Sequence, residues 1–255
     1  MYKPLLTACR TLTIIRLPGA DTKHFEQSLY GFPIVGALLG LLCLGFVWLF
    51  QAWFSSLGVL VEALILMALL FIVTGGLHWD GLADWADSKG AGQNRQRALE
   101  IMKDSSVGAF GVAALVLYGL LWSHLAAGLF AAEHWPRLFL VLLFSRTLQV
   151  EFICCYPYAR LAPGMAAPFV AGANQWHRLV VLLLAVGISV PFFGESVFYV
   201  LAAGYMSTHL FGFVENRRLG GITGDLIGAN NQLNEVILLI VLRLAPEPFI
   251  FGGWW

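Results

Sequence analysis

Long apolar stretches recur along the chain and set its expected architecture. Seven of them approach the roughly 20 residues that a helix needs to cross the hydrocarbon core of a bilayer. Their expected ranges are 30–53, 57–79, 107–131, 136–154, 179–194, 196–214 and 226–245. The first half of the last stretch is polar, with Asn230, Asn231, Gln232, Asn234 and Glu235. The pattern predicts an all-α fold, a polytopic integral membrane helical bundle of about seven transmembrane helices.

Lysine and arginine are unevenly distributed between the two ends of these stretches. Twelve of the 15 basic residues fall in the N-terminal segment and in segments 80–106, 155–178 and 215–225, which share one side of a seven-span arrangement. Basic loops tend to remain in the cytoplasm. The charge pattern therefore predicts a cytoplasmic N-terminus.

The composition agrees with a chain surrounded by lipid. Charged residues make up 12% of the sequence, about half of what a soluble domain carries. The formal net charge is zero and no basic tract is present, so we expect the lipid bilayer, and no nucleic acid, as a partner. We expect a single transmembrane catalytic domain over 1–255, with motifs on the cytoplasmic side at 74–106 and 215–229. A homo-oligomer is compatible with this pattern.

A first motif follows the second apolar stretch and reads Gly76-Leu77-His78-Trp79-Asp80-Gly81-Leu82-Ala83-Asp84. Asp80, Asp84 and Asp87 are spaced i, i+4 and i+7, which places three carboxylates along one stripe of a helix. Like charges at this spacing repel one another, and a shared cation would remove that cost. Hard oxygen ligands suit Mg²⁺. We expect all three as metal ligands and Asp80 and Asp84 as catalytic, the alternative being a solvated acidic helix end.

His78 lies two residues before Asp80. A lone histidine near a helix start is commonly a hydrogen-bonded structural residue. Beside three carboxylates it could instead act as a base or a ligand. We include His78 among the expected catalytic residues.

A second segment, Arg97 to Ser105, follows a glycine-containing link. Arg97, Glu100 and Asp104 share a helix face by the same periodicity. Asp104 could add a fourth carboxylate to the cation site, and Arg97 and Lys103 could bind phosphate oxygens. The alternative is an amphipathic interfacial helix with internal ion pairs.

A third segment runs from Arg218 through Gly220-Gly221-Ile222-Thr223-Gly224-Asp225. Glycines allow a backbone to approach a phosphate closely, and a helix that begins near Thr223 would offer free N–H groups. We expect substrate to be bound by Arg218, Gly221, Thr223 and Asp225. The alternative is helix packing through the spacing of Gly224 and Gly228, which leaves the Asp225 carboxylate unexplained.

Four further ionisable residues fall within or beside the apolar stretches. Glu235 lies deepest, where an ionisable group is a functional candidate. For Glu151, Arg146 and Glu62 we favour a structural role, as a buried ion pair and an interfacial carboxylate.

At these motifs the chain resembles the cobalamin synthase family, the adenosylcobinamide-GDP ribazoletransferases. The likeness also covers Arg16-Leu17-Pro18, Phe32-Pro33-Ile34-Val35-Gly36, Glu100-Ile101-Met102-Lys103-Asp104-Ser105 and Tyr158-Ala159-Arg160. The first and third motifs, in this order and at this separation, are a specific combination.

The resemblance implies an enzyme that joins adenosylcobinamide-GDP to α-ribazole or its 5′-phosphate and releases GMP, with Mg²⁺ as cofactor. It implies that Asp80, Asp84, Asp87 and Asp104 hold Mg²⁺ on the diphosphate, and that the Asp225 loop holds phosphate or ribose. It also implies residence in the bacterial cytoplasmic (inner) membrane, with the active face toward the cytoplasm. Phosphoryl transfer relies on charge neutralisation and alignment, which these residues could supply.

Two other functions share part of this pattern. A CDP-alcohol-type phosphotransferase would use the same metal chemistry and topology. A membrane cation or metabolite transporter would use Asp225, Glu235 and Glu151 as a pathway, and should carry acids at membrane depth.

Overall fold

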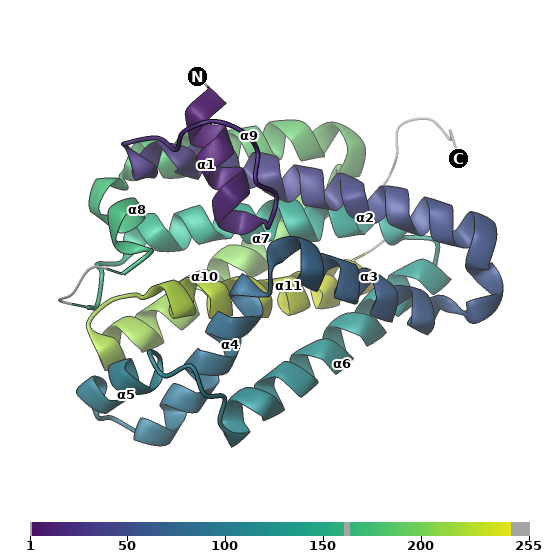
Figure 1. The fold of residues 1–255 in the computed structure, drawn as a ribbon. Coiled ribbons are helices and arrows are strands. Elements are labelled where there is room, and N and C mark those ends of the chain that lie inside the picture. The colour runs from purple at the N-terminus through teal and green to yellow at the C-terminus, as the bar shows by residue number, and fades with distance from the viewer. Residues whose placement is uncertain (1, 161–163, 246–255) are drawn as a thin grey trace.

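The computed structural model describes residues 2–160 and 164–245, and helices dominate them (Figure 1). Short 3₁₀ turns link several of the helices, and the only extended pairing in the described residues is an isolated bridge between Tyr158 and Ile222. The α-helices are α1 (Tyr2–Leu12), α2 (Phe32–Phe54), α3 (Val59–Thr74), α4 (Leu77–Asp87), α5 (Arg95–Ile101), α6 (Ala109–Ala131), α7 (Leu138–Cys155), α8 (Ala167–Gly172), α9 (Gln175–Phe193), α10 (Ser196–Leu219) and α11 (Gly224–Leu244). The expected all-α fold is confirmed.

Two helices form the centre of the bundle. α7 is buried on all sides, and its neighbours are α2, α9, α10 and α11. α11 contacts α4, α6, α7 and α10. Their side chains therefore pack against protein, whereas α2, α3, α6, α9 and α10 expose leucine, valine and phenylalanine outward, as helices that face lipid do.

Five helices in the described residues are long and apolar enough to cross a membrane. The number rises to six if α3 and the helical segment 77–91, which are joined by a sharp bend, are counted as one span. They correspond to the first, third, fourth, fifth and sixth predicted stretches. The seventh stretch forms α11, whose many polar side chains are buried inside the bundle. A polar helix at this place is stable because neighbouring helices shield it from lipid.

The second predicted stretch is not one straight span. α3 ends at Thr74, and α4 leaves it at an angle of 94°. Gly75 and Gly76 both adopt left-handed conformations, with φ of 63° and 67°, which a residue with a Cβ adopts at a cost. The expected range 57–79 was therefore too long. α4 carries three carboxylates in 11 residues, so we place only α3 in the membrane and treat α4 as lying outside the spans.

The connections gather at two ends of the bundle (Figure 1). α4, α5, the segment after α7, α8 and the α10–α11 turn lie toward one end, which we call the motif end. The α2–α3, α6–α7 and α9–α10 connections lie toward the other. The bends and packing of the helices thus bring the first and third motifs together.

Candidate active site

α4 and α11 meet through glycine. A Cβ placed on Gly81 of α4 would lie 2.7 Å from the carbonyl oxygen of Asp225 on α11. A Cβ on Gly228 would lie 3.2 Å from the Cα of His78. Larger residues would push the two helices apart, so these glycines hold the first motif against the third. Gly228 therefore packs against α4, as the helix-packing alternative expected, whereas a Cβ on Gly224 would meet only Ala166, at 3.8 Å. Both glycines border a cavity.

That cavity has a volume of about 500 Å³ and lies at the motif end. Its walls come from α1, the 3₁₀ turn before α2, the start of α2, α4, α7, the segment after α7, α8, and the start of α11. Its polar lining consists of Thr7, Arg10, Thr11, Asp21, His78, Asp80, Gln149, Tyr158, Arg160 and Asp225, and its apolar lining includes Leu12, Phe25, Phe32, Ile153 and Phe169. A mostly apolar wall with a few convergent polar groups is typical of a small-molecule site. We refer to it as the motif-end cavity.

Carboxylates are concentrated beside this cavity. Asp80 is exposed, and Asp84 is half-buried one turn further along α4. Burial, and then the charges of Asp80, Asp225 and Asp87, raise the pKa of Asp84 from 3.8 to about 7. Burial likewise raises the pKa of Asp225, against the lowering effect of its partner Arg160. Concentrated negative charge of this kind is relieved by a cation.

These carboxylates do not form a closed cation cage. In the described ranges, no three of their oxygens lie within 4.8 Å of one another. The reason is geometric, because Cβ atoms one helical turn apart are separated by about 5–6 Å. The donor set nevertheless suits Mg²⁺, which usually binds through one or two carboxylates together with waters and substrate phosphates.

Two of the four expected metal ligands are held elsewhere. Asp87 accepts hydrogen bonds from the backbone N–H groups of Gly108 (2.7 Å) and Gly111 (2.8 Å), at the start of α6, where a carboxylate stabilises a helix. Asp104 is exposed and accepts hydrogen bonds from the backbone and side chain of Ser106. Neither lines the motif-end cavity, so helix capping and a local turn account for both.

The second segment also stays outside the cavity. Arg97 lies on α5, where its exposed guanidinium pairs with Glu100 at 3.5 Å. Lys103 is exposed just beyond α5. The arrangement matches the alternative reading of this segment, a surface helix with an internal ion pair.

Arg218 connects helices and does not line the cavity. Its Nε donates to Glu215 at 2.9 Å, and its Nη2 donates to the Ser88 hydroxyl at 2.7 Å. Lys89 pairs with the same glutamate. The side chain of Arg218 is only 8% exposed, so its hydrogen-bonding capacity is largely used in joining α10 to the segment after α4.

The glycine turn before α11 packs against protein. Gly221 has a φ of 150°, and a Cβ there would collide with the carbonyl oxygen of Pro157. Thr223 caps α11, and its hydroxyl accepts a hydrogen bond from the Leu226 N–H at 3.3 Å. The backbone at Gly221 was expected to lie close to a phosphate, but in the structure it lies close to the segment after α7. Asp225, in contrast, reaches the cavity.

His78 is buried between two cavities. It lines the motif-end cavity and also a second, small one. Its Nε2 lies 2.7 Å from Nε2 of the Gln149 side chain. Gln149 on α7 therefore orients the ring, and Nδ1 is the ring atom left for other partners.

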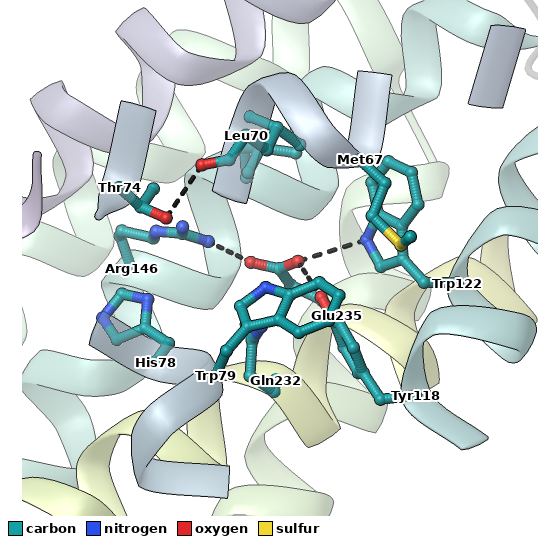
Figure 2. A pocket seen from close by; sticks show the side chains of 11 residues that line it. Met67, Leu70, Thr74, His78, Trp79, Tyr118, Trp122, Arg146, Gln232 and Glu235 are labelled. Atoms are coloured by element: carbon teal, nitrogen blue, oxygen red, sulfur yellow. Dashed lines mark hydrogen bonds and ion pairs between the residues drawn. The ribbon is translucent and has the colours of Figure 1, made fainter. Parts of the chain in front are cut away.

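The small cavity, about 10 Å³, lies next to a buried polar network on α7, α6 and α11 (Figure 2). Glu235 pairs with Arg146 and accepts hydrogen bonds from the Tyr118 hydroxyl (2.9 Å), the Trp122 indole N–H (3.1 Å) and the Asn231 amide (3.0 Å). We call these five residues the core network. The volume allows about one water molecule, so Glu235 is a packed structural group with no room for a substrate.

Glu151 belongs to a separate cluster between α7, α9 and α10. Arg178 clamps both of its oxygens, at 2.8 and 2.6 Å. His209 and Cys155 approach the same carboxylate at 3.1 and 3.2 Å. The ion-pair partner of the buried Glu151 is thus the partly exposed Arg178, while Arg146 pairs with Glu235. Glu62 is buried at the start of α3.

Seven polar residues of the cavity were not identified from the sequence as site residues: Thr7, Arg10, Thr11, Asp21, Gln149, Tyr158 and Arg160. Arg10 and Asp21 form an ion pair at 3.0 Å that joins α1 to the following loop. Arg160 stood in the Tyr158-Ala159-Arg160 likeness without a role. The sequence features that could have pointed to these residues were the basic residues of the N-terminal segment and the Tyr158-Ala159-Arg160 likeness. Gln149 gave none, since a single glutamine inside an apolar helix has no distinctive pattern.

Comparison with known proteins supplies a family. The sequence profile of the family described as cobalamin-5-phosphate synthase matches residues 4–243. A protein of Chlorobium phaeovibrioides named adenosylcobinamide-GDP ribazoletransferase is 38% identical, over 98% of this chain and 100% of its own length. Proteins with the same name from Chlorobium chlorochromatii (39% identical) and Syntrophobacter fumaroxidans (37%) match 98% and 94% of this chain and 99% and 97% of their own lengths. No solved structure matches the chain.

The extent of these matches covers the spans and all three motifs, including Asp80, Asp84, Arg160 and Asp225. The chain therefore belongs to the cobalamin-5-phosphate synthase family and is a membrane-embedded transferase of cobalamin biosynthesis.

Proposed function

We propose that this chain is an adenosylcobinamide-GDP ribazoletransferase that works in the motif-end cavity. It joins adenosylcobinamide-GDP to α-ribazole or its 5′-phosphate and releases GMP. A ribose hydroxyl oxygen forms a bond to the phosphorus that carries the corrinoid aminopropanol, and the bond from that phosphorus to the GMP oxygen breaks. The hydroxyl proton leaves to a base.

The observation that supports this proposal most strongly is the composition of the cavity. Asp80 and Asp225 come from separate motifs and line it together with Arg160. A phosphoryl-transfer site needs cation-binding oxygens and a phosphate-binding guanidinium in one place. The full-length likeness to proteins named for this reaction agrees with that chemistry.

We propose Mg²⁺ as the cofactor, held by Asp80 and Asp84. The exposure of Asp80, the hard oxygen donors and the negative charge around Asp84 suit this ion. When bound, Mg²⁺ supplies charge neutralisation on the diphosphate. Asp87 and Asp104 are not part of this proposal, because the start of α6 and Ser106 respectively engage them.

The chain's own groups have separate tasks. Arg160 binds a phosphate oxygen, and the apolar wall with Phe25, Phe32 and Phe169 excludes water from the reacting atoms. His78 accepts the amide N–H of Gln149 at Nε2, so its own proton lies on Nδ1 and can be donated to a substrate oxygen. A carboxylate of the cavity takes the hydroxyl proton. Gly81 keeps α4 and α11 close enough for these groups to act together.

We propose that the motif end faces the cytoplasm of a bacterial inner membrane. Twelve of 15 basic residues belong to segments on that side, and both substrates are polar molecules. A cysteine introduced at Lys89 should react only with reagents that enter the cell, whereas one at Glu133 should react from outside. Labelling of position 89 in intact cells by an impermeant reagent would contradict this orientation.

The direct test of the reaction is a product assay. Purified protein is incubated with adenosylcobinamide-GDP, α-ribazole and Mg²⁺, and both corrinoid product and GMP are quantified by mass spectrometry. The proposal predicts equal amounts of the two products. Release of GMP without a ribazole-containing corrinoid, or no product under conditions where the protein remains folded, would refute it. Substitution of a CDP-alcohol for the corrinoid substrate tests the rival phosphotransferase in the same assay.

A further inference from the structure

Arg160 occupies an unusual position at the edge of the motif-end cavity. Its Nη2 donates to the Asp225 carboxylate at 2.7 Å and to the carbonyl oxygen of Met102 at 3.2 Å. Its Nε is buried and has no hydrogen-bond partner among the residues that the structure describes. A guanidinium has five N–H donors in a fixed fork. Arg160 therefore holds Asp225 while donor capacity remains for another acceptor.

A second unpartnered polar atom lies close in sequence on the same wall. The Tyr158 hydroxyl is buried, and it too has no partner in ranges 2–160 and 164–245. Both residues line the motif-end cavity. Buried polar atoms are nearly always hydrogen-bonded in native proteins. Arg146 Nε in the core network also lacks a partner among the described residues, but only a cavity of about 10 Å³ lies beside it. The Arg160 and Tyr158 atoms belong to residues that line a cavity of about 500 Å³, so they point to a polar ligand that completes them.

The charge of Arg160 also acts on more than one carboxylate. It opposes the mutual repulsion of Asp84 and Asp225, and Asp80 contributes to that repulsion at both. The guanidinium thus supplies the positive charge that the carboxylates need when no metal ion is bound. A divalent cation that enters this cluster would meet a like charge at Asp225.

We propose that Arg160 is an exchangeable counter-ion: it neutralises Asp225 in the free protein and moves to a phosphate of the nucleotide-activated substrate when a divalent cation binds. Asp225 then joins Asp80 and Asp84 around that cation. The inference rests on the proposed function, because it assumes a cation and a phosphate-bearing substrate in the cavity. It assigns Arg160 a role in binding the substrate phosphate. It also makes cation binding and phosphate binding depend on each other.

The exchange predicts opposite effects on the two ligands. Arg160→Gln should tighten binding of a divalent cation to the substrate-free protein, roughly tenfold, because a competing positive charge has been removed. The same change should raise the KM for the nucleotide-activated substrate about ten- to a hundredfold, because a charge-assisted contact to phosphate is lost. A purely structural arginine would not change two affinities in opposite directions.

Arg95 provides a matched control. It holds the same segment by donating to the carbonyl oxygens of Ala159 (2.8 Å) and Leu219 (2.6 Å). Both acceptors are backbone carbonyl oxygens, so these bonds do not neutralise a carboxylate. Arg95→Gln should loosen the segment and lower the melting temperature without tightening cation binding. Arg160→Lys retains the charge beside Asp225 and should keep cation affinity near that of the unaltered protein.

The experiment measures Mn²⁺ binding to full-length protein in detergent by electron paramagnetic resonance, without substrate. Unaltered protein, Arg160→Gln, Arg160→Lys, Arg95→Gln and Arg160→Gln/Asp225→Asn are compared, and KM is measured for the single variants. Tighter Mn²⁺ binding in Arg160→Gln alone, lost in the double variant, supports the exchange. Unchanged or weaker Mn²⁺ binding in Arg160→Gln overturns it, as does equal tightening in Arg95→Gln.

This outcome is separable from the proposed function. Formation of GMP and corrinoid product by the unaltered protein supports the reaction whatever the Mn²⁺ titrations give. If that reaction fails while Arg160→Gln still binds Mn²⁺ more tightly, the substrate assignment is wrong and the counter-ion role stands.

Discussion

Two groups of charged residues lie close together in this protein and differ in how their charges are satisfied. In the core network, Glu235 has Arg146, Tyr118, Trp122 and Asn231 as partners around a cavity of about 10 Å³. At the motif-end cavity, Asp80 lines the wall and is exposed, and Asp84, one turn further along α4 and beside the cavity, stands among like charges.

The difference separates structural from functional charge. Glu235 would be identified as functional from membrane depth alone, yet its oxygens are surrounded by donors, as a buried structural ion requires. The carboxylates at the motif end carry a repulsion that the protein leaves in place. That residual cost is what a cation and an anionic substrate would remove, and it distinguishes the site from the core network.

The largest expected effect is on catalysis, in Asp80→Asn. The change removes a charge from the cavity and retains the shape of the side chain. Turnover should fall about a thousandfold or more, because a bound cation stabilises the transition state by several kcal/mol. The melting temperature should change little, because Asp80 is exposed. GMP release and thermal unfolding of the same preparation measure both. Near-normal turnover at limiting Mg²⁺ would remove Asp80 from the cation site.

The next effect is on stability, in Glu235→Ala. Removal of one partner leaves Arg146 buried without its counter-ion, which costs about 3–5 kcal/mol. The variant should therefore unfold at a clearly lower denaturant concentration. The double variant Glu235→Leu/Arg146→Met should recover much of that loss, because no uncompensated charge remains. Unaltered stability in Glu235→Ala would show that the core network is not structural.

A smaller effect is expected in Arg218→Ala. The sequence suggested substrate binding, which would predict a rise in KM, but the side chain joins Glu215 to Ser88. Loss of buried charge-assisted bonds should lower stability by about 1–3 kcal/mol and leave KM for the nucleotide-activated substrate nearly unchanged. Steady-state kinetics beside denaturant unfolding separates the two interpretations. A large rise in KM at unchanged stability would restore the phosphate-binding role.

The smallest effect concerns pH. The pKa of Asp84 is raised from 3.8 to about 7 in the folded protein, so the folded state binds this proton more tightly than the unfolded state. Its contribution to stability is full below pH 4 and is lost as the pH rises through about 7. Asp84→Asn should flatten the melting temperature between pH 5 and 8, and Mg²⁺ should restore stability at the upper end. An identical pH profile in Asp84→Asn would contradict this.

Periodic and compositional signals predicted much of the fold. The lengths of the apolar stretches predicted the long helices. The basic residues predicted which connecting segments lie on the same side, and the structure places these segments at one end. The bend after α3 was missed because Gly75-Gly76 sits within an apolar stretch, where hydropathy alone continues the span. α1 was missed because Tyr2–Leu12 is short and mixes polar with apolar residues.

The site was only partly predictable, for a different reason. Asp80, Asp84 and Asp225 stand in unusual local sequence, and the structure places them together. Asp87 and Arg218 have the same residue types in the same motifs, yet their contacts with Gly108 and Glu215 are tertiary. Arg160 gains its role from a partner 65 positions away. Spacing along one helix cannot reveal which charged groups another helix has already engaged.

The most direct measurement is the Mg²⁺ dependence of GMP release in two conservative variants, one from each region. Asp80→Asn and Glu235→Gln each replace one carboxylate by an amide. The account predicts that Asp80→Asn abolishes turnover or moves half-saturation to much higher Mg²⁺, whereas Glu235→Gln keeps the half-saturation of the unaltered protein even if less folded enzyme is recovered. A normal Mg²⁺ curve in Asp80→Asn, or a shifted one in Glu235→Gln, would contradict the assignment of the motif-end cavity as the cation-dependent active site.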